Sequence, residues 1–215
     1  MGEFFNPEKG IWAWLSTLVD IFGLSILWIF LCLPVVTAGP ATAALYYAVV
    51  KCVRKRDSGA FREYFRSFRT NFKVGLGAAL IVIPLFLLLL GGYRIVLWYG
   101  TRLGGTAYIL YVAYYFALLL PLGVLCWLFP LLGRFEYGVR GLFRTALQLT
   151  VAHLPSTVII VLLTVQSAVF CLERWWPVVF LPAAAVLLVS LFTERIFQKH
   201  SPELAAEERT EPEEE

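Results

Sequence analysis

Residues 74–93 read VGLGAALIVIPLFLLLLGGY, twenty successive residues without a charged side chain. A helix needs about 20 apolar residues to cross the hydrocarbon layer of a bilayer. Within that layer the backbone must satisfy its own hydrogen bonds, so a run of this length is expected to be a membrane-spanning helix. Four further long apolar runs occur along the chain, and together they predict a multi-pass membrane protein.

The composition of the whole chain supports this interpretation. Of the 215 residues, 60% are hydrophobic, and the mean hydropathy is +0.75, whereas a soluble fold must keep a polar surface. The alternating pattern of a β-barrel strand is missing from the sequence. We therefore expect an all-α, polytopic membrane helix bundle of about five transmembrane helices. The predicted spans are roughly 13–36, 74–97, 107–132, 156–173 and 177–194.

Charge predicts how these spans are oriented. Basic residues gather between spans one and two, from Lys51 to Lys73, and again after span three, from Arg134 to Arg144. The positive-inside rule places both segments in the cytoplasm, which gives an outside N-terminus and a cytoplasmic C-terminus. We therefore expect a membrane that has the cytoplasm on one side.

The net charge of +3 combines a basic body with an acidic end. Residues 203–215 hold seven Glu and one Arg, so the remainder has 17 Lys and Arg (18 − 1) against 8 acids (15 − 7), a balance of +9. A basic body fits anionic lipid headgroups, and no groove-reading element points to nucleic acid. We expect one membrane domain over 1–197 and an acidic, disordered cytoplasmic tail over 198–215.

An internal repeat is indicated by two segments with a similar order of features, residues 13–97 and 107–173. Their first spans end at Leu33-Pro34 and at Phe129-Pro130. Each then has a basic segment with the same tripeptide, Phe68-Arg69-Thr70 in the first and Phe143-Arg144-Thr145 in the second. Units of one orientation would be parallel repeats, with the last span, 177–194, added at the end.

The segments between spans predict amphipathic cytoplasmic or interfacial helices. From residue 60 to residue 73, aromatic residues and cations each recur with helical spacing, on separate faces. Such helices either lie among the headgroups or form a docking surface for a partner. The candidate docking or lipid contacts are Arg62, Arg66, Phe68, Arg69, Phe143 and Arg144. Residues 41–55 are expected to form a cytoplasmic helix or a re-entrant helix broken at Gly39-Pro40.

Asp20 is the acid that lies inside a predicted span away from its ends. An ionised carboxylate in hydrocarbon costs several kcal/mol, so such a residue needs a role or a partner. Ser16 and Ser25 lie within two turns of it, and Arg134 is a candidate ion partner. These four residues are a candidate polar intramembrane site, which serves either a proton or ion pathway or helix–helix bonding.

The sequence contains none of the usual catalytic or metal-binding sets. The chain has two histidines, no H-E-x-x-H motif, and no Gly-rich phosphate loop. The four cysteines are scattered through apolar surroundings without a C-x-x-C pair, as expected of packing residues. We expect a protein that is not an enzyme and that uses no metal or cofactor.

The segment WIFLCLPVVTAGPA, residues 28–41, followed by Ala44-Leu45-Tyr46-Tyr47, resembles the N-terminal signature of the bacterial YesL family. The stretches FRSFRTNF at 65–72 and FPLLGRFE at 129–136, with His153-Leu154-Pro155, are also similar to that family. One departure is Ser25, where such proteins often carry Asn. The resemblance extends over about residues 5–195. It implies a small integral membrane protein associated with carbohydrate uptake, in a family of unknown function.

Three functions remain open at this point. The first is a non-catalytic accessory or regulatory component associated with carbohydrate uptake, whose partner is a sugar transporter or a sensor kinase. The alternative is a small transporter or channel, for which five spans would have to assemble as a homo-oligomer. The third is a role in binding membrane lipids through the basic aromatic helices.

Overall fold

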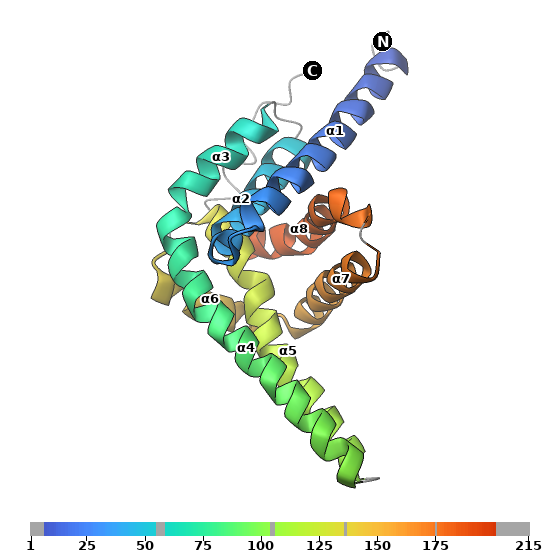
Figure 1. Cartoon of the computed structure of the whole chain (residues 1–215). Helices are drawn as coiled ribbons and strands as arrows, with labels where there is room; N and C mark the ends of the chain where they lie inside the picture. The colour runs from blue at the N-terminus through green and yellow to red at the C-terminus, as the bar shows by residue number, and fades with distance from the viewer. Residues whose placement is uncertain (1–6, 55–58, 104–105, 136, 175, 201–215) are drawn as a thin grey trace.

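The computed structural model describes residues 7–54, 59–103, 106–135, 137–174 and 176–200, and within them every regular element is helical. The longer helices are α1 (Pro7–Cys32), α2 (Ala38–Ala48), α3 (Ala60–Thr70), α4 (Phe72–Leu103), α5 (Thr106–Arg134), α6 (Val139–Ala152), α7 (Leu154–Glu173) and α8 (Leu181–His200). Three short helical segments complete the fold: the 3-10 helices η1 (Val35–Thr37) and η3 (Trp176–Val179), and the π-helix η2 (Val49–Arg54). The all-α prediction is confirmed for this part of the chain (Figure 1).

Within the described residues, six segments, one more than predicted, are long and apolar enough to span a membrane. Five of them correspond to the predicted spans. The sixth, Val35–Arg54, includes the stretch that we expected to be cytoplasmic or re-entrant. Five crossings put the chain ends on opposite sides of the membrane and six put them on the same side, so the predicted outside N-terminus depends on this segment.

The break between α1 and α2 lies at Pro34, where the first span was expected to end, and α2 runs without a break through Gly39-Pro40, the break of the re-entrant alternative. Proline has no backbone N–H and disfavours a helical conformation of the residue before it, so α1 ends at Cys32. The Thr37 amide then bonds the Pro34 carbonyl across η1. Pro40 falls in the first turn of α2, where the missing N–H would have had no helical partner.

The core of the molecule is built around α2 and η2, residues 38–54, which together we name the central helix. It is in contact with α1, α3, α4, α5 and α8. It contributes to two buried clusters, one around Trp127 and Tyr46, the other around Leu24, Leu45 and Tyr64. Small residues let other helices approach closely: a Cβ on Gly39 would lie 2.5 Å from the Gly75 carbonyl oxygen of α4.

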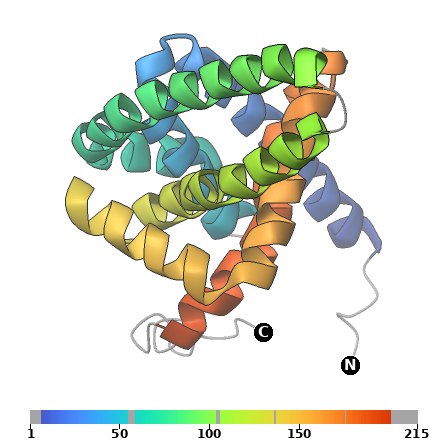
Figure 2. The ribbon, with the colours of Figure 1, turned by 90° about the horizontal axis from the view of Figure 1, so that it is seen from below.

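Helices α4 and α5 form a long antiparallel hairpin that extends away from the central helix (Figure 1). Seen from below, α5 lies between α4 and α6 (Figure 2). The outward sides of α4 and α7 carry exposed leucines such as Leu87, Leu88 and Leu172. Exposing this apolar surface to water would be unfavourable, whereas the hydrocarbon of a bilayer solvates it well. These several long apolar helices are consistent with a multi-pass membrane protein.

The predicted repeat has an imperfect counterpart in the structure. Phe68-Arg69-Thr70 ends α3 directly before the chain turns at Asn71, while Phe143-Arg144-Thr145 lies near the middle of α6. The central helix follows the first span of one unit, whereas only residues 135–138 separate α5 from α6. The parallel repeat therefore stays a prediction.

The boundary that we predicted between the membrane domain and the acidic tail falls inside a helix. α8 continues to His200, so residues 198–200 belong to it. The rest of the predicted tail, residues 201–215, lies outside the described residues.

Candidate functional site

A buried ion pair joins α5 to α8 at the C-terminal end of α5. Arg134 Nη2 lies 2.7 Å from Glu194 Oε2, and the two side chains are only 16% and 4% exposed. The Tyr46 hydroxyl donates a hydrogen bond to Glu194 Oε1 over 2.8 Å and also lies 2.7 Å from Thr193 Oγ1. Because a charge buried without a partner is costly, this network strongly favours one arrangement of α2, α5 and α8.

Gly133 allows this network to form. A Cβ at this position would lie 2.8 Å from the carbonyl oxygen of Ala43, so α5 and α2 are in contact backbone to backbone. This close approach brings Arg134 and Tyr46 within reach of the same carboxylate. At the other end of the central helix, Arg54 Nη1 donates to the Ser190 carbonyl over 3.2 Å, which fixes that end to α8 as well.

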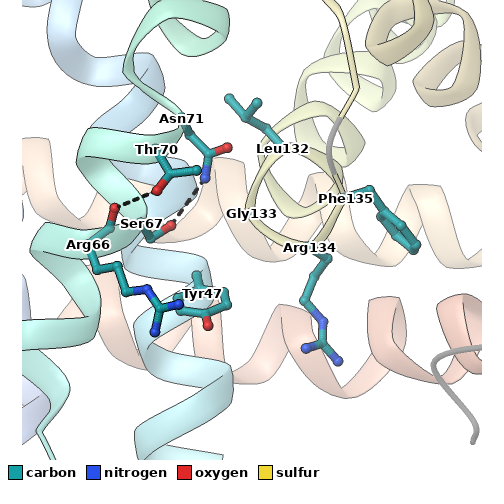
Figure 3. A pocket seen from close by; sticks show the side chains of 9 residues that line it. All are labelled: Tyr47, Arg66, Ser67, Thr70, Asn71, Leu132, Gly133, Arg134 and Phe135. Carbon is teal, nitrogen blue, oxygen red and sulfur yellow. Dashed lines mark hydrogen bonds between the residues drawn. The ribbon is translucent and has the colours of Figure 1, made fainter. Parts of the chain in front are cut away.

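A polar pocket of about 210 Å³ lies beside the network, between α2, α3 and the end of α5. It is lined by Tyr47, Arg66, Ser67, Thr70, Asn71, Leu132, Gly133, Arg134 and Phe135. Figure 3 shows the α3 residues on one side, the α5 residues on the other, and Tyr47 of α2 between them. The Asn71 amide donates to Ser67 Oγ over 3.2 Å, and the Thr70 hydroxyl donates to the Arg66 carbonyl over 3.0 Å.

Helix α3 is attached to the central helix by one face and carries cations on the other. Tyr64 is fully buried, its hydroxyl donates to the Ala41 carbonyl over 3.1 Å, and burial raises its pKa. Glu63 pairs with Lys51 of the central helix at 3.3 Å. The predicted contacts Arg62, Arg66 and Arg69 are all exposed, while Phe68 packs partly buried against the α1–α2–α3 cluster. The expected amphipathic helix is thus confirmed.

The equivalent segment in α6 is used differently. Phe143 packs partly buried against the cluster around Trp127, and Arg144 is exposed. Of this predicted pair, only the arginine lies on the surface.

The four residues of the predicted intramembrane site do not form one cluster. Ser25 is fully buried, and its Oγ accepts a hydrogen bond from the Ala183 amide at the start of α8 over 3.2 Å. Arg134 binds Glu194, which lies eleven residues after Ala183 on α8. At a helical rise of about 1.5 Å per residue, the two positions on α8 are about 16 Å apart. Arg134 thus has a partner other than Asp20. Asp20 is half-buried on α1, and Ser16 is exposed.

The sequence did contain one signal for the residues that we missed. Glu194 is the last residue of the predicted last span, 177–194, whereas α8 continues six residues beyond it. An acid within an apolar helix calls for a partner, so Glu194 was as good a candidate as Asp20. Tyr46, Tyr47 and Asn71 lie in the segments quoted above for the family resemblance, but neither hydropathy nor helical period marks them as site residues.

A second, larger cavity of about 440 Å³ lies between α1, the central helix, α5, α7 and α8. Its lining is apolar apart from a few hydroxyl and thiol groups, among them the free cysteines Cys126 and Cys171. Thr164 and Ser167 in this lining donate to carbonyls of their own helix, and Thr42 accepts from Trp28. Among the described residues, no three His, Cys, Asp or Glu side chains are grouped so as to hold a metal ion.

Comparison with known proteins gives one match. Residues 21–93 match a family model described as "Protein of unknown function, DUF624". The matched region runs from α1 through the central helix and α3 into α4, so it contains the α3 side of the polar pocket but neither Arg134 nor Glu194. No curated protein and no solved structure matches the chain.

Proposed function

We propose that the chain is a YesL-like accessory or regulatory component of the bacterial cytoplasmic membrane, non-catalytic and associated with carbohydrate uptake. The observation that supports a docking role best is the outer face of α3. Phe61 and Phe65 are 42% and 43% exposed on that helix, beside the exposed cations Arg62, Arg66 and Arg69. A rigidly attached helix that offers exposed aromatic and guanidinium groups together is typical of interface contacts.

The attachment of α3 matters to this proposal. Tyr64 and Glu63 tie the helix to the central helix, so its exposed face has a fixed position relative to the membrane bundle. A preorganised surface loses little conformational entropy when a partner binds. A sugar transporter subunit or a sensor kinase in the same membrane is the kind of partner that we propose.

Purification of the tagged full chain in mild detergent, followed by mass spectrometry, tests this proposal. Wild type is expected to retain a sugar-transporter or sensor-kinase polypeptide, and Phe65→Ala is expected to lose most of it. Phe86→Ala is the matched control, because Phe86 is similarly exposed, at 48%, but lies on α4. Recovery of only lipid and the chain itself in several detergents would contradict the accessory role, as would equal losses in both variants.

The alternative of a small transporter or channel has less support. The larger cavity would be its natural pathway, but the lining is apolar, and the hydroxyls of Thr164 and Ser167 are already bonded within their helix. A sugar pathway needs polar groups that can replace water around the sugar hydroxyls. Flux of a sugar or of protons into reconstituted vesicles, reduced in Asp20→Asn, would reverse this preference.

A further inference from the structure

We propose that the polar pocket between α2, α3 and the end of α5 binds a phosphate-bearing polyol. The phosphodiester headgroup of a glycerol-based anionic lipid and a soluble sugar phosphate share this chemistry. The proposal goes beyond the accessory role, because it requires no protein partner. It rests on the juxtaposition of Arg66 and Arg134, from two different helices, with hydroxyl and amide groups in one pocket.

The charge of the pocket suits a monovalent anion. Glu194 neutralises Arg134 in the buried pair. Glu63 is shared: it lies 3.3 Å from Lys51 and 3.8 Å from Arg66. These three cations and two carboxylates leave a balance of +1, and the Arg66 side chain, 72% exposed, carries the cation that reaches the pocket mouth. A phosphodiester has a single negative charge, which this balance matches, and a phosphate monoester has about −1.5 to −2 at neutral pH, which it matches in part. A guanidinium fork is a suitable partner for both.

The pocket also has different chemistry at its two ends. Figure 3 shows both guanidinium groups toward one end and Thr70 and Asn71 toward the other, with the Asn71 side-chain oxygen directed toward α5. The wall opposite Asn71 includes Leu132 and Gly133, in the last turn of α5. Carbonyls in the last turn of a helix lack intrahelical partners and accept hydrogen bonds from other groups. One end therefore suits a phosphate and the other suits the hydroxyls of a polyol.

The size of the pocket limits what it can hold. At about 210 Å³ it is smaller than the roughly 300–1,000 Å³ of a site for a drug-sized ligand. This volume accommodates a glycerol phosphate or a small sugar phosphate but not the acyl chains of a lipid. If the source is a lipid, the chains extend outside the pocket, and the exposed apolar residues of α4, beginning with Phe72, offer them a surface.

Two binding measurements on the full chain distinguish the two sources. In the lipid arm, native mass spectrometry records how much phosphatidylglycerol the protein retains from mixed phosphatidylglycerol–phosphatidylcholine nanodiscs. In the soluble arm, equilibrium dialysis measures sn-glycerol 3-phosphate and glucose 6-phosphate binding in nanodiscs of phosphatidylcholine alone. The variant is Arg66→Gln, and Arg62→Gln is the matched control, since Arg62 is an exposed arginine of α3 outside the pocket lining.

We expect Arg66→Gln to weaken binding about tenfold in one arm, and Arg62→Gln to weaken it less than about twofold through general electrostatics. Loss confined to the first arm identifies a lipid headgroup, and loss confined to the second identifies a soluble phosphate. The proposal is overturned if wild type binds neither probe better than Arg66→Gln does, or if both variants weaken binding equally. Recovery of a protein partner is measured separately, so the accessory role can stand or fall independently of this result.

Discussion

Glu194→Gln is expected to destabilise the folded protein strongly, because it removes one charge of a buried pair. Glu194 is 4% exposed in its side chain and lies 2.7 Å from Arg134. After the substitution the Arg134 guanidinium, which is 16% exposed, is left in the same surroundings without a counterion. The Tyr46 hydroxyl, which donates to Glu194, then has a neutral amide oxygen as its acceptor in place of a carboxylate.

The size of the effect follows from which interaction dominates. Removing one partner of a buried ion pair costs about 3–5 kcal/mol, chiefly through the charge that remains. A hydrogen bond between helices in a membrane contributes on average about 0.6 kcal/mol, so the weakening of the Tyr46 bond is a small addition. We therefore expect about 3–5 kcal/mol for Glu194→Gln. The double variant Arg134→Leu with Glu194→Leu should cost less than this, because no unpaired charge is left.

The assay is reversible unfolding in mixed micelles with increasing sodium dodecyl sulfate, followed by tryptophan fluorescence. Glu173→Gln serves as the control, because Glu173 is an exposed acid at the end of α7 and its removal should change the unfolding free energy by at most about 0.5 kcal/mol. The four proteins, wild type included, are compared at the same lipid-to-detergent ratio.

Two results would refute this reasoning. One is a cost below about 1 kcal/mol for Glu194→Gln, because the loss of a solvent-exposed ion pair costs no more than that. The other is a double variant that is less stable than Glu194→Gln, which would show that the unpaired Arg134 charge is not the main cost.

Three further predictions use other features of the fold. Gly39→Ala should destabilise the protein by about 1–3 kcal/mol, because the added Cβ would clash with an α4 carbonyl. Gly91→Ala should be neutral or slightly stabilising, because nothing lies within 4 Å of its added Cβ. The unfolding assay described above measures both variants. Trp127→Phe should cost about 0.5–1.5 kcal/mol or more, since the buried indole loses its 2.9 Å hydrogen bond to a threonine hydroxyl of α7; a variant as stable as wild type would contradict this. Reporter fusions after Lys55 and after Arg174 should report opposite sides of the membrane, and a reporter at the N-terminus should agree with the Lys55 fusion if Val35–Arg54 crosses.

The amphipathic segment illustrates what periodicity can and cannot predict. The spacing of Phe61, Tyr64, Phe65 and Phe68 predicted a helix with an aromatic face, and α3 is that helix. The spacing did not indicate that Tyr64 would be fully buried while Phe61 and Phe65 stay 42% and 43% exposed. The reason is that a helical period gives the angular position of a side chain but not which neighbour covers it.

Local signals in the sequence determined the spans themselves. An apolar run such as Val74 to Tyr93 can satisfy its backbone hydrogen bonds in lipid only as a helix, whatever surrounds it. Five of the six candidate spans among the described residues therefore follow from apolar length alone. Pro34 likewise ends α1 because its ring removes the backbone N–H that a continuing helix would need.

Only the tertiary structure decided that residues 38–54 form the centre of the molecule and that Arg134 binds Glu194. These two residues are sixty positions apart, and Tyr46 lies 148 positions from Glu194. Their meeting depends on how closely α5 approaches α2 at Gly133 and on which turn of α8 faces them. Hydropathy and helical period carry no information on such distances, because they describe each helix separately, whereas an ion pair depends on the packing of three helices at once.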